Sequence, residues 1–377
     1  MTTERQMTSR GLWRSVSTAL AAAIIAASAV PAQAGEGVIQ INQAKALAGG
    51  VTAGDGAGFP VTISAPGSYR LTGDLTVPNA NTNAVSITAD SVTLDLNGFS
   101  IAGPTTCTYS YPNVTCGGTE GTGTGVVAAT SRVTVRNGRV RGMGSDAIDL
   151  GALGRVEGVD VVSNGGAGIT LGDAGVALRN RVSRNLSSGI AAGDGARVSD
   201  NRVGSNDGTA ISVGAGGSLT GNVVSSADDA IAATSDVSIV GNMSLGIAGT
   251  GVSVTSGGVI ASNLIWVHSS GIGDGVTVGQ GVSVRHNLIK GGVGAAGIEA
   301  GSGNTIIGNM VLAGGSGSYG IQFTGSANGY VDNTILASMP NYDVSGSGGV
   351  ELGQNFCCSE SDPAECDGIS QCPYPGE

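Results

Sequence analysis

Four carboxylates in the second half of the chain have types and spacings that could do chemistry. They are Asp228, Asp229, Asp274 and Glu299, and His268 lies between them in the sequence. Two carboxyl groups on either side of a glycosidic bond can act as acid and base, and histidine titrates close to neutral pH. These five residues predict a polysaccharide lyase or a glycoside hydrolase, provided that the fold brings them together.

Four further side chains could bind a sugar polymer rather than react with it. The rings of Trp266 and Tyr319 could stack on a pyranose, and Arg181 with Arg202 could form a patch for acidic polysaccharide. Each has a structural alternative, because tryptophan can cover an outer wall and stacked arginines can form a solvated charged wall. The carboxylates share this alternative, since Asp before a Gly-Ile step is typical of a corner.

A repeat of 21 residues must position all of these side chains. Ile169, Ile190 and Ile211 recur at this spacing, and Asn180 and Asn201 follow the first two by eleven residues. The same step from a small residue to an aliphatic one occurs at Val126, Ile148, Ile169, Ile190, Ile211, Ile231, Val252, Val276, Ile298 and Ile321. A period that lasts this long predicts an array of stacked units.

Each repeat contains three short apolar blocks. Counted from the Ile, apolar residues occupy offsets 0 and 2, then 8, then 13, as in Ile211, Val213, Leu219 and Val224. Alternation by two is the period of a strand, and the Gly, Asn, Ser and Asp between the blocks favour turns. We therefore expect an all-β parallel β-helix with three short strands per coil. Its recurring Asn is expected in a left-handed corner, bonded to the Asn of adjacent coils.

The motif of Gly168-Ile169-Thr170-Leu171, followed by Asn180, resembles the right-handed parallel β-helix repeat of the pectate-lyase-like superfamily. The resemblance extends over about Ala84 to Leu336 and implies a single-stranded right-handed helix of about ten to eleven coils. The runs at 43–50, 66–71 and 94–98 also resemble the start of a group of bacterial secreted β-helix proteins of undefined function.

In that superfamily, polysaccharide lies along the sheet that the Gly-Ile-x-Leu strands build. The resemblance therefore implies a polysaccharide partner on this face, where Asp274 and Glu299 fall on adjacent coils. The Asp228-Asp229 step resembles that of the polygalacturonase-like hydrolases, but the other elements of their signature are missing. The arginine-flanked lyase motif and the Asp-Pro-His-Glu epimerase motif are also missing.

The chain is expected to have four parts. An apolar run preceded by three arginines and followed by Ala32-Gln33-Ala34 predicts a Sec-type signal peptide, and hence a periplasmic or extracellular protein. The parts are the signal peptide at 1–34, an N-terminal cap with the first strands at 35–83, the β-helix at 84–337 with an inserted loop at 104–125, and a Cys-rich C-terminal cap at 338–377.

The N-terminal cap should contain a short helix. Asn42 is a favourable N-cap for a helix that ends at Ala48, before Gly49 and Gly50. We expect Ala44, Leu47 and Ala48 to face the first coil, because an open end of a solenoid exposes apolar core and must be covered.

Six cysteines in an exported chain predict disulfides. Cys107 and Cys116 lie in one inserted loop and could pair locally. The other four are close together at the C-terminus, and three pairings stay open: Cys357, Cys358, Cys366 and Cys372. Zinc is the alternative, but no histidine accompanies this cluster. We expect no metal and no cofactor.

The charge of the chain restricts its partners. The formal net charge is −11, and loss of the three arginines and one glutamate of residues 1–34 changes it to −13. Such acidity disfavours nucleic acid and anionic membrane as partners, and no second hydrophobic segment predicts a membrane span in the mature chain.

The favoured interpretation is a secreted protein that binds carbohydrate or builds a surface layer. The alternatives are a polysaccharide lyase or hydrolase acting between Asp228 and Glu299, and a self-associating adhesin or filament component. The sequence leaves the oligomeric state open.

Overall fold

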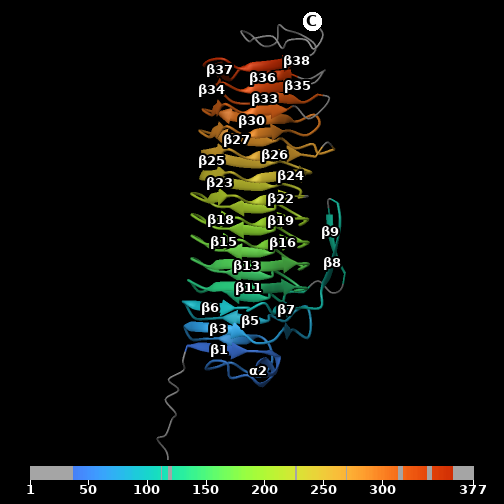
Figure 1. Cartoon of the computed structure of the whole chain (residues 1–377), viewed down its shortest axis with the longest axis vertical. Helices are drawn as coiled ribbons and strands as arrows, with labels where there is room; N and C mark the ends of the chain where they lie inside the picture. The colour runs from blue at the N-terminus through green and yellow to red at the C-terminus, as the bar shows by residue number, and fades with distance from the viewer. Residues whose placement is uncertain are drawn as a thin grey trace, which may run out of the picture. The chain divides into compact units, whose positions relative to one another are not determined.

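The computed structural model describes residues 37–111, 113–117, 121–225, 227–268, 270–312, 317–337 and 342–359. The chain divides into two units, Met1–Val38 and Ile39–Glu377, and the complete coils belong to the second. Figure 1 shows these coils stacked in sequence order from the N-terminal strands to β38 (Phe356–Ser359). The predicted signal peptide lies outside the described residues.

One side of every coil is a strand that begins at or shortly before the aliphatic residue of the repeat, and these strands form sheet A. On adjacent parallel strands Ile169 lies beside Ile190, and Ile190 beside Ile211, so the predicted vertical alignment is confirmed. Sheet A contains β2 (Val61–Ile63), β5 (Val85–Ile87), β10 (Val126–Ala128), β12 (Ile148–Leu150), β14 (Ile169–Leu171), β17 (Ile190–Ala192), β20 (Ile211–Val213), the first halves of β23 (Ile231–Val240) and β25 (Val252–Ala261), then β27 (Val276–Gln280), β30 (Ala296–Ser302), β33 (Tyr319–Phe323) and β36 (Tyr342–Ser345).

The second side of each coil forms sheet B, which begins where β1 (Val38–Ile41) pairs with β3. Sheet B contains β3 (Gly67–Leu71), β6 (Val92–Asp95), the first halves of β11 (Thr134–Arg141) and β13 (Arg155–Val162), β15 (Val176–Leu178), β18 (Arg197–Ser199), β21 (Ser218–Thr220), the second halves of β23 and β25, then β28 (Ser283–Arg285), β31 (Thr305–Ile307), β34 (Asn328–Val331) and β37 (Gly349–Glu351).

The third side of each coil forms sheet C. Sheet C contains β4 (Leu75–Thr76), β7 (Ser100–Ala102), the second halves of β11 and β13, β16 (Arg181–Ser183), β19 (Arg202–Gly204), β22 (Val223–Ser225), β24 (Met243–Ile247), β26 (Leu264–Val267), β29 (Leu288–Lys290), β32 (Met310–Leu312), β35 (Thr334–Ala337) and β38. The class predicted from the sequence, an all-β parallel β-helix with three strands per coil, is therefore confirmed.

The stack has about 13 turns, more than the ten to eleven predicted. The additional turns are at the two ends. The coils that contain β2 and β36 lack the Gly-Ile-x-Leu motif, although they pair in register with their neighbours. Pairing between backbones requires only extended chain, so it continues beyond the residues that carry the motif.

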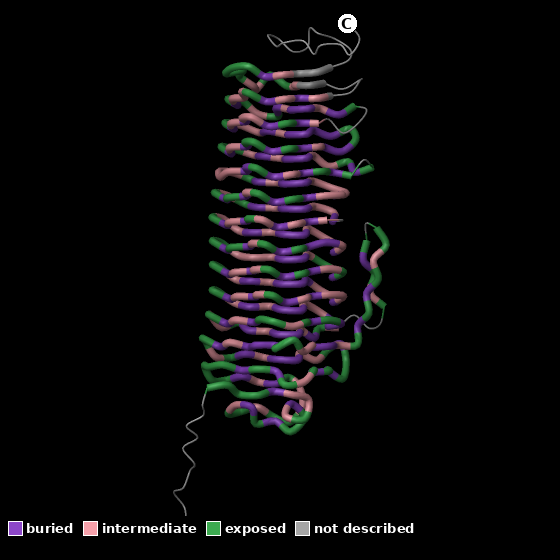
Figure 2. Tube along the Cα trace, viewed as in Figure 1, coloured by how far each residue is buried: buried purple, intermediate pink, exposed green. Residues whose placement is uncertain are grey.

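A narrow apolar interior runs through all of the coils. Ile169, Ile190 and Ile211 are fully buried, and so are Leu219 and Val224 on the other two sides. Figure 2 shows that buried segments recur at the same places on successive turns. Each such side chain contributes about 1.5–3 kcal/mol when it is removed from water, so the core is strengthened by every added coil.

Nine buried asparagines form a ladder at the corner between sheets B and C. The Nδ2 of each donates to the Oδ1 of the next over 2.9–3.1 Å, and that oxygen also accepts the backbone N–H of the preceding Asn. The ladder runs through Asn180, Asn201, Asn222, Asn242, Asn263, Asn287, Asn309, Asn333 and Asn355. The predicted bonding between adjacent coils is confirmed.

The predicted backbone at this corner is wrong by one residue. The left-handed residue is the one before the asparagine in the ladder from Asn180 to Asn333, as at Arg179, Asp200 and Ser262, with φ of 54°, 56° and 55°. The chain turns there, which lets the asparagine point inward and satisfy buried backbone groups. Asn137 occupies the turning position itself, with φ 57°, and is exposed, so it does not belong to the ladder.

The structure also contains a second asparagine ladder, which the sequence analysis did not predict. At the corner between sheets C and A, Asn164 Nδ2 donates to Asn185 Oδ1 over 2.8 Å, and Asn185 Nδ2 donates to Asn206 Oδ1 over 2.9 Å. All three side chains are buried. Sharp corners of the early coils are therefore supported by amide bonds on two sides.

The helix of the N-terminal cap is α2 (Gln43–Ala48), as predicted. Asn42 Oδ1 accepts the backbone N–H of Lys45 over 2.9 Å, and Gly49 ends the helix with φ 76°. The predicted buried face is wrong, however, because Ala44, Leu47 and Ala48 are all exposed.

A different residue of this helix faces the core. Ala46 is fully buried, whereas Leu47 is 56% exposed. The side chain of Gln43 both donates to and accepts from the backbone of Thr76 in β4, which fixes the rotation of the helix about its axis. These two bonds turn Ala46 toward the first coil.

The inserted loop forms a hairpin arm made of antiparallel β8 (Thr106–Ser110) and β9 (Asn113–Gly117). Cys107 and Cys116 lie directly opposite each other and form a disulfide, which confirms the local pairing. The arm lies alongside later coils, since the backbone N–H of Val114 donates to Asp207 Oδ1 over 2.9 Å. The arm is therefore part of the outer surface of the solenoid.

The pairing of the four C-terminal cysteines stays a prediction. β38 contains the backbones of Cys357 and Cys358, while Cys366 and Cys372 lie outside the described residues. Within the part of the chain that the structure describes, no helix is long and apolar enough to cross a membrane.

We predict that Asn222→Ala lowers the free energy of unfolding by about 3 kcal/mol, because it leaves several buried partners unsatisfied. Asn222 donates to the carbonyl of Val198 over 2.8 Å as well as to Asn242, and accepts from Asn201. Thr220→Ala, an exposed position in the same coil, is the control and should change stability little. Chemical denaturation of both variants checks this, and equal stability would show that the ladder contributes nothing.

Candidate functional site

Three of the carboxylates on sheet A hold the corner that precedes the sheet. In each case Oδ1 of the Asp accepts a backbone N–H from the next coil. The bonds are Ala167 N to Asp146 at 2.8 Å, Thr250 N to Asp229 at 2.7 Å and Ala296 N to Asp274 at 2.7 Å. A carboxylate used in this way replaces a missing backbone acceptor, which is a structural task.

Asp274 and Glu299 are brought together, as the sequence predicted. Thr277 pairs in register with Glu299, and its hydroxyl donates to Asp274 Oδ2 over 3.0 Å. Partial burial, the nearby charge of Asp274 and a hydrogen bond between the two carboxyl groups raise the pKa of Glu299. The surroundings of Glu299 therefore disfavour its ionised form.

Both oxygens of Asp274 accept hydrogen bonds from the protein. Oδ1 accepts the backbone N–H of Ala296 and Oδ2 accepts the hydroxyl of Thr277. This carboxylate is therefore used to hold the corner and the strand that follows it.

Two more carboxyl groups on or beside sheet A have raised pKa values. Burial and then the charge of Asp146 raise the pKa of Asp149, which points outward from β12. Burial, then Asp207 and Asp229, raise the pKa of Asp228. Asp207 is the residue that accepts the arm's backbone N–H, so Asp228 lies at the corner beside the hairpin arm.

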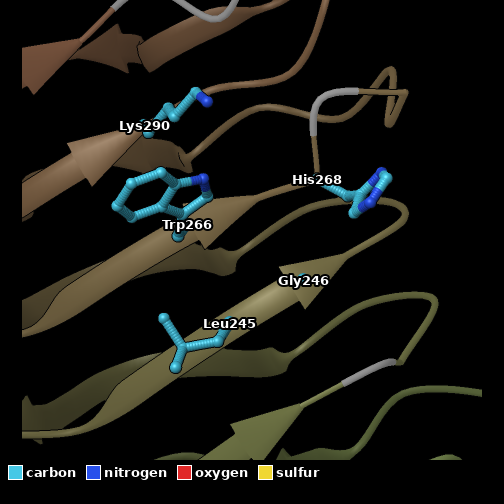
Figure 3. A pocket seen from close by; sticks show the side chains of 5 residues that line it. All are labelled: Leu245, Gly246, Trp266, His268 and Lys290. Atoms are coloured by element: carbon cyan, nitrogen blue, oxygen red, sulfur yellow. The ribbon is translucent and has the colours of Figure 1, made fainter.

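A shallow pocket of about 380 Å³ opens on sheet C rather than on sheet A. It is lined by Leu245, Gly246, Trp266, His268 and Lys290, which come from β24, β26 and β29 and the turn after β26 (Figure 3). Trp266 is 43% exposed, and the Nζ of Lys290 lies 4.8 Å from the centroid of its ring. The indole is thus an exposed aromatic surface with a cation beside it.

The hairpin arm reaches the edge of this pocket. The ring of Tyr111, at the turn of the arm, lies 5.5 Å from the ring of His268. His268 Nδ1 is also 2.8 Å from the hydroxyl of Ser270. Aromatic side chains from two segments far apart in the sequence are therefore gathered at one place, which we name the indole pocket.

The strand below Trp266 is irregular. The register between β24 and β26 shifts between Leu245 and Ile247, around Gly246 with φ 67°. Ser244 replaces the Val or Ile that fills the core in adjacent coils, and its buried hydroxyl has no hydrogen-bond partner in the described structure. Bulges and unpaired buried groups occur preferentially beside functional sites.

The predicted site residues fall into separate groups. Trp266 and His268 share the indole pocket, and Asp274 and Glu299 share sheet A. Tyr319 lies at the start of β33 in sheet A, and Asp228 with Asp229 lies in a corner.

The two candidate arginines lie on sheet C. Arg181 and Arg202 are exposed register partners in its early coils, and neither forms an ion pair with a described residue. The described residues also contain no group of three or more His, Cys, Asp or Glu side chains placed to hold a metal ion.

Sequence reasoning missed Leu245 and Lys290, and it placed Tyr111 in a loop that could bind a ligand or be a stapled surface excursion, without predicting which coils the loop contacts. The first two were detectable, because each lies three residues after a ladder asparagine, as Trp266 does. The position of Tyr111 beside the pocket was not detectable, because nothing in the arm's own sequence says which coils it will lie against.

No protein-family model and no curated protein sequence matches the chain. Among solved structures, the A-module of mannuronan C-5 epimerase AlgE6 from Azotobacter vinelandii is 16% identical at a TM-score of 0.44, covering 83% of this chain and 87% of the module.

Two further structures are similarly distant. The catalytic unit of the GH87 alpha-1,3-glucanase from Streptomyces thermodiastaticus has 16% identity and a TM-score of 0.46, over 83% of this chain and 63% of that unit. The Dettilon tailspike protein has 15% identity and a TM-score of 0.44, over 75% and 59%. Likeness at this level carries no argument about activity, and the fold assignment rests on the strand register.

We predict that Glu299→Gln raises the unfolding temperature at pH 7. The folded pKa of Glu299 lies above its ordinary value of 4.5, so its ionised form is disfavoured by folding. The stability it contributes is complete below the unfolded pKa and is lost as pH rises through the folded pKa. The difference between variant and wild type should therefore disappear near pH 4. Thermal unfolding from pH 4 to 8 checks this, with exposed Asp332→Asn as control, and a pH-independent difference would contradict it.

Proposed function

We propose that this protein binds carbohydrate at the indole pocket without cleaving it. The observation that carries the proposal is the exposed indole of Trp266 on sheet C, with Lys290 beside it and Tyr111 nearby on the arm. Large aromatic side chains are normally used to fill cores, but here only 3% of the residues are aromatic and one of them is held at the surface.

The chemistry of the pocket suits a sugar ring. A pyranose has apolar C–H faces that can pack on an indole, and hydroxyl groups at its rim that need polar partners. The ammonium of Lys290 can donate to such hydroxyls, and the imidazole of His268 can donate or accept. Leu245 extends the apolar floor below the indole. The pocket therefore offers both kinds of contact to one ligand.

The carboxylates support binding rather than cleavage. Asp274 lies in the corner before β27 and Glu299 lies in β30, whereas the indole pocket belongs to sheet C. Both oxygens of Asp274 already accept hydrogen bonds from the protein. The described residues that line the pocket include no carboxylate that could act as acid or base.

We further propose that the protein works outside the cytoplasm. The support is the Cys107–Cys116 disulfide, since such bonds persist in oxidising compartments, together with the signal peptide that residues 1–34 predict. A surface-layer role and assembly into filaments are the other candidates for the same compartment.

We predict that Trp266→Ala weakens binding of the best ligand by about tenfold, which corresponds to about 1.4 kcal/mol. A panel of neutral and uronic-acid oligosaccharides identifies that ligand, and calorimetry measures the affinity. Val350→Ala, an exposed apolar position on sheet B, is the control and should bind normally. Reducing-end and unsaturated-product assays on the same panel should stay negative. Turnover of any glycan, or full affinity in the tryptophan variant, would overturn the proposal.

We predict a smaller effect at the arm, about threefold, for Tyr111→Ala. Tyr111 adjoins the pocket through His268 rather than forming its floor, so only part of the contact with a ligand is lost. The same titrations check this. Affinity unchanged to within error would show that the arm does not take part in binding.

A further inference from the structure

The outward side chains around the indole pocket form a longer apolar surface on sheet C. One column runs in register through adjacent coils, and a second column runs beside it at positions two residues later. We name these eight residues the apolar strip: Val223, Met243, Leu264, Leu288 and Met310 in the first column, and Leu245, Trp266 and Leu312 in the second, which Lys290 interrupts.

The side chains of the strip point away from the core and are at least partly exposed to solvent. Met243, Leu288 and Met310 are 38%, 37% and 44% exposed. The alternate residues of the same strands, such as Ile265 and Ile289, point inward and are buried. An exposed contiguous apolar surface on a monomer usually marks a place of binding.

The same sheet is charged in the earlier coils. At the positions of the first column, the coils before Val223 carry Arg139, Asp160, Arg181 and Arg202, in register with one another and with Val223. The outward side of sheet C therefore changes from charged to apolar at one coil, while its buried side stays aliphatic except at Ser244. The outward positions can carry any residue that is compatible with solvent exposure. The change therefore concerns the surface of sheet C and not its packing.

We propose that a linear glycan lies along the apolar strip, parallel to the stacking direction of the coils, with the indole pocket as its central subsite. This inference rests on the proposed carbohydrate binding and adds the class of ligand: an extended, equatorially linked chain that is neutral or sparsely charged. It also places the ligand on sheet C rather than on the sheet of the Gly-Ile-x-Leu strands.

The size of the strip favours a narrow occupant. Five coils spaced ~4.8 Å apart make it about 20 Å long, and its two columns are about 7 Å apart. A surface of this size is well below the roughly 800 Å² per partner that a stable protein interface buries. A second copy of this chain therefore fits the strip less well than a single polymer chain does.

The lack of polar groups in the strip favours a glycan over an extended peptide. The backbone groups of these strands already bond the adjacent coils, so a peptide laid on them would lose water from its own N–H and C=O groups without replacement. An equatorially linked pyranose instead presents C–H groups to the strip and keeps its hydroxyls toward water.

Charge narrows the class of glycan. None of the outward positions of the strip is acidic, and Lys290 is the one cation among them. The chain as a whole has a formal net charge of −11, which would repel a densely charged polyanion at long range. A neutral chain, or one with an occasional carboxylate for Lys290, fits both conditions.

The test is a length series. Calorimetry of the full chain with β-1,4-linked oligomers of glucose and of N-acetylglucosamine, from one to six sugars, should show affinity that rises at least tenfold from one sugar to four. Met243→Glu and Met310→Glu should weaken binding of the hexasaccharide about fivefold and leave the single sugar unaffected. Val350→Glu, on sheet B, is the matched control, and unchanged unfolding temperatures establish that the variants fold.

The outcomes separate the two proposals. Failure of every oligosaccharide to bind would overturn the carbohydrate function itself. Affinity that is independent of length, or insensitive to the two methionine variants, would overturn the strip and leave the pocket as a binding site. If sedimentation shows a dimer that Met310→Glu dissociates while glycan affinity is unchanged, the strip is an interface between copies of this chain, and the glycan assignment to it is wrong.

Discussion

The register between adjacent coils is the constraint on which the rest of the structure depends. Backbone ladder bonds between coils require each coil to lie directly on the last, so Ile169, Ile190 and Ile211 must form a column. The asparagine ladder imposes the same register through side chains, because the Nδ2 of each amide must lie about 3.0 Å from the Oδ1 of the next. Inward positions and corners are consequently fixed, whereas outward positions are restricted only by solvent.

This division explains why the three sheets differ on their surfaces. Sheet A carries carboxylates tied to its corner by backbone bonds, and sheet C carries charge early and apolar side chains late, over an interior that barely changes. The outer columns repeat every coil, so a substitution at one outward position extends a surface rather than creating an isolated feature. A long, regular binding surface is therefore easy to build on this fold, while a compact constellation of different catalytic groups needs departures from the repeat.

The sequence was sufficient for the fold because the same signal occurs many times. The columns of Ile169 and Leu219 and the amide bonds of Asn222 follow directly from spacing. The exact turning residue did not follow, because a residue before Asn and the Asn itself both tolerate left-handed backbone. The face of the N-terminal helix was wrong because two bonds from Gln43 to β4, which no periodicity encodes, set its rotation.

The candidate site was only half predictable. Trp266 and His268 attracted attention as rare residue types, and Asp274 with Glu299 followed from counting coils. Their chemistry did not follow, because spacing along the sequence does not show that both oxygens of Asp274 accept hydrogen bonds from the protein. Lys290 and Leu245 did not follow, because a single exposed Lys or Leu is a common surface residue and only the register places both beside Trp266. The destination of the arm depended on contacts of Val114 and Tyr111 with coils that lie far later in the sequence.

The arm leaves the solenoid in an N-terminal coil and contacts Asp207 and His268 in later coils. Both contacts can form only if the distance between Asp207 and His268 matches the arm. Solenoids commonly evolve by gaining or losing whole repeats. In this protein, a coil inserted or deleted between Asp207 and His268 would displace His268 from Tyr111 by one coil spacing, ~4.8 Å, if the arm kept its bond to Asp207. A change in the number of turns in that interval would therefore break one of the arm's two contacts, whereas a change beyond it would break neither.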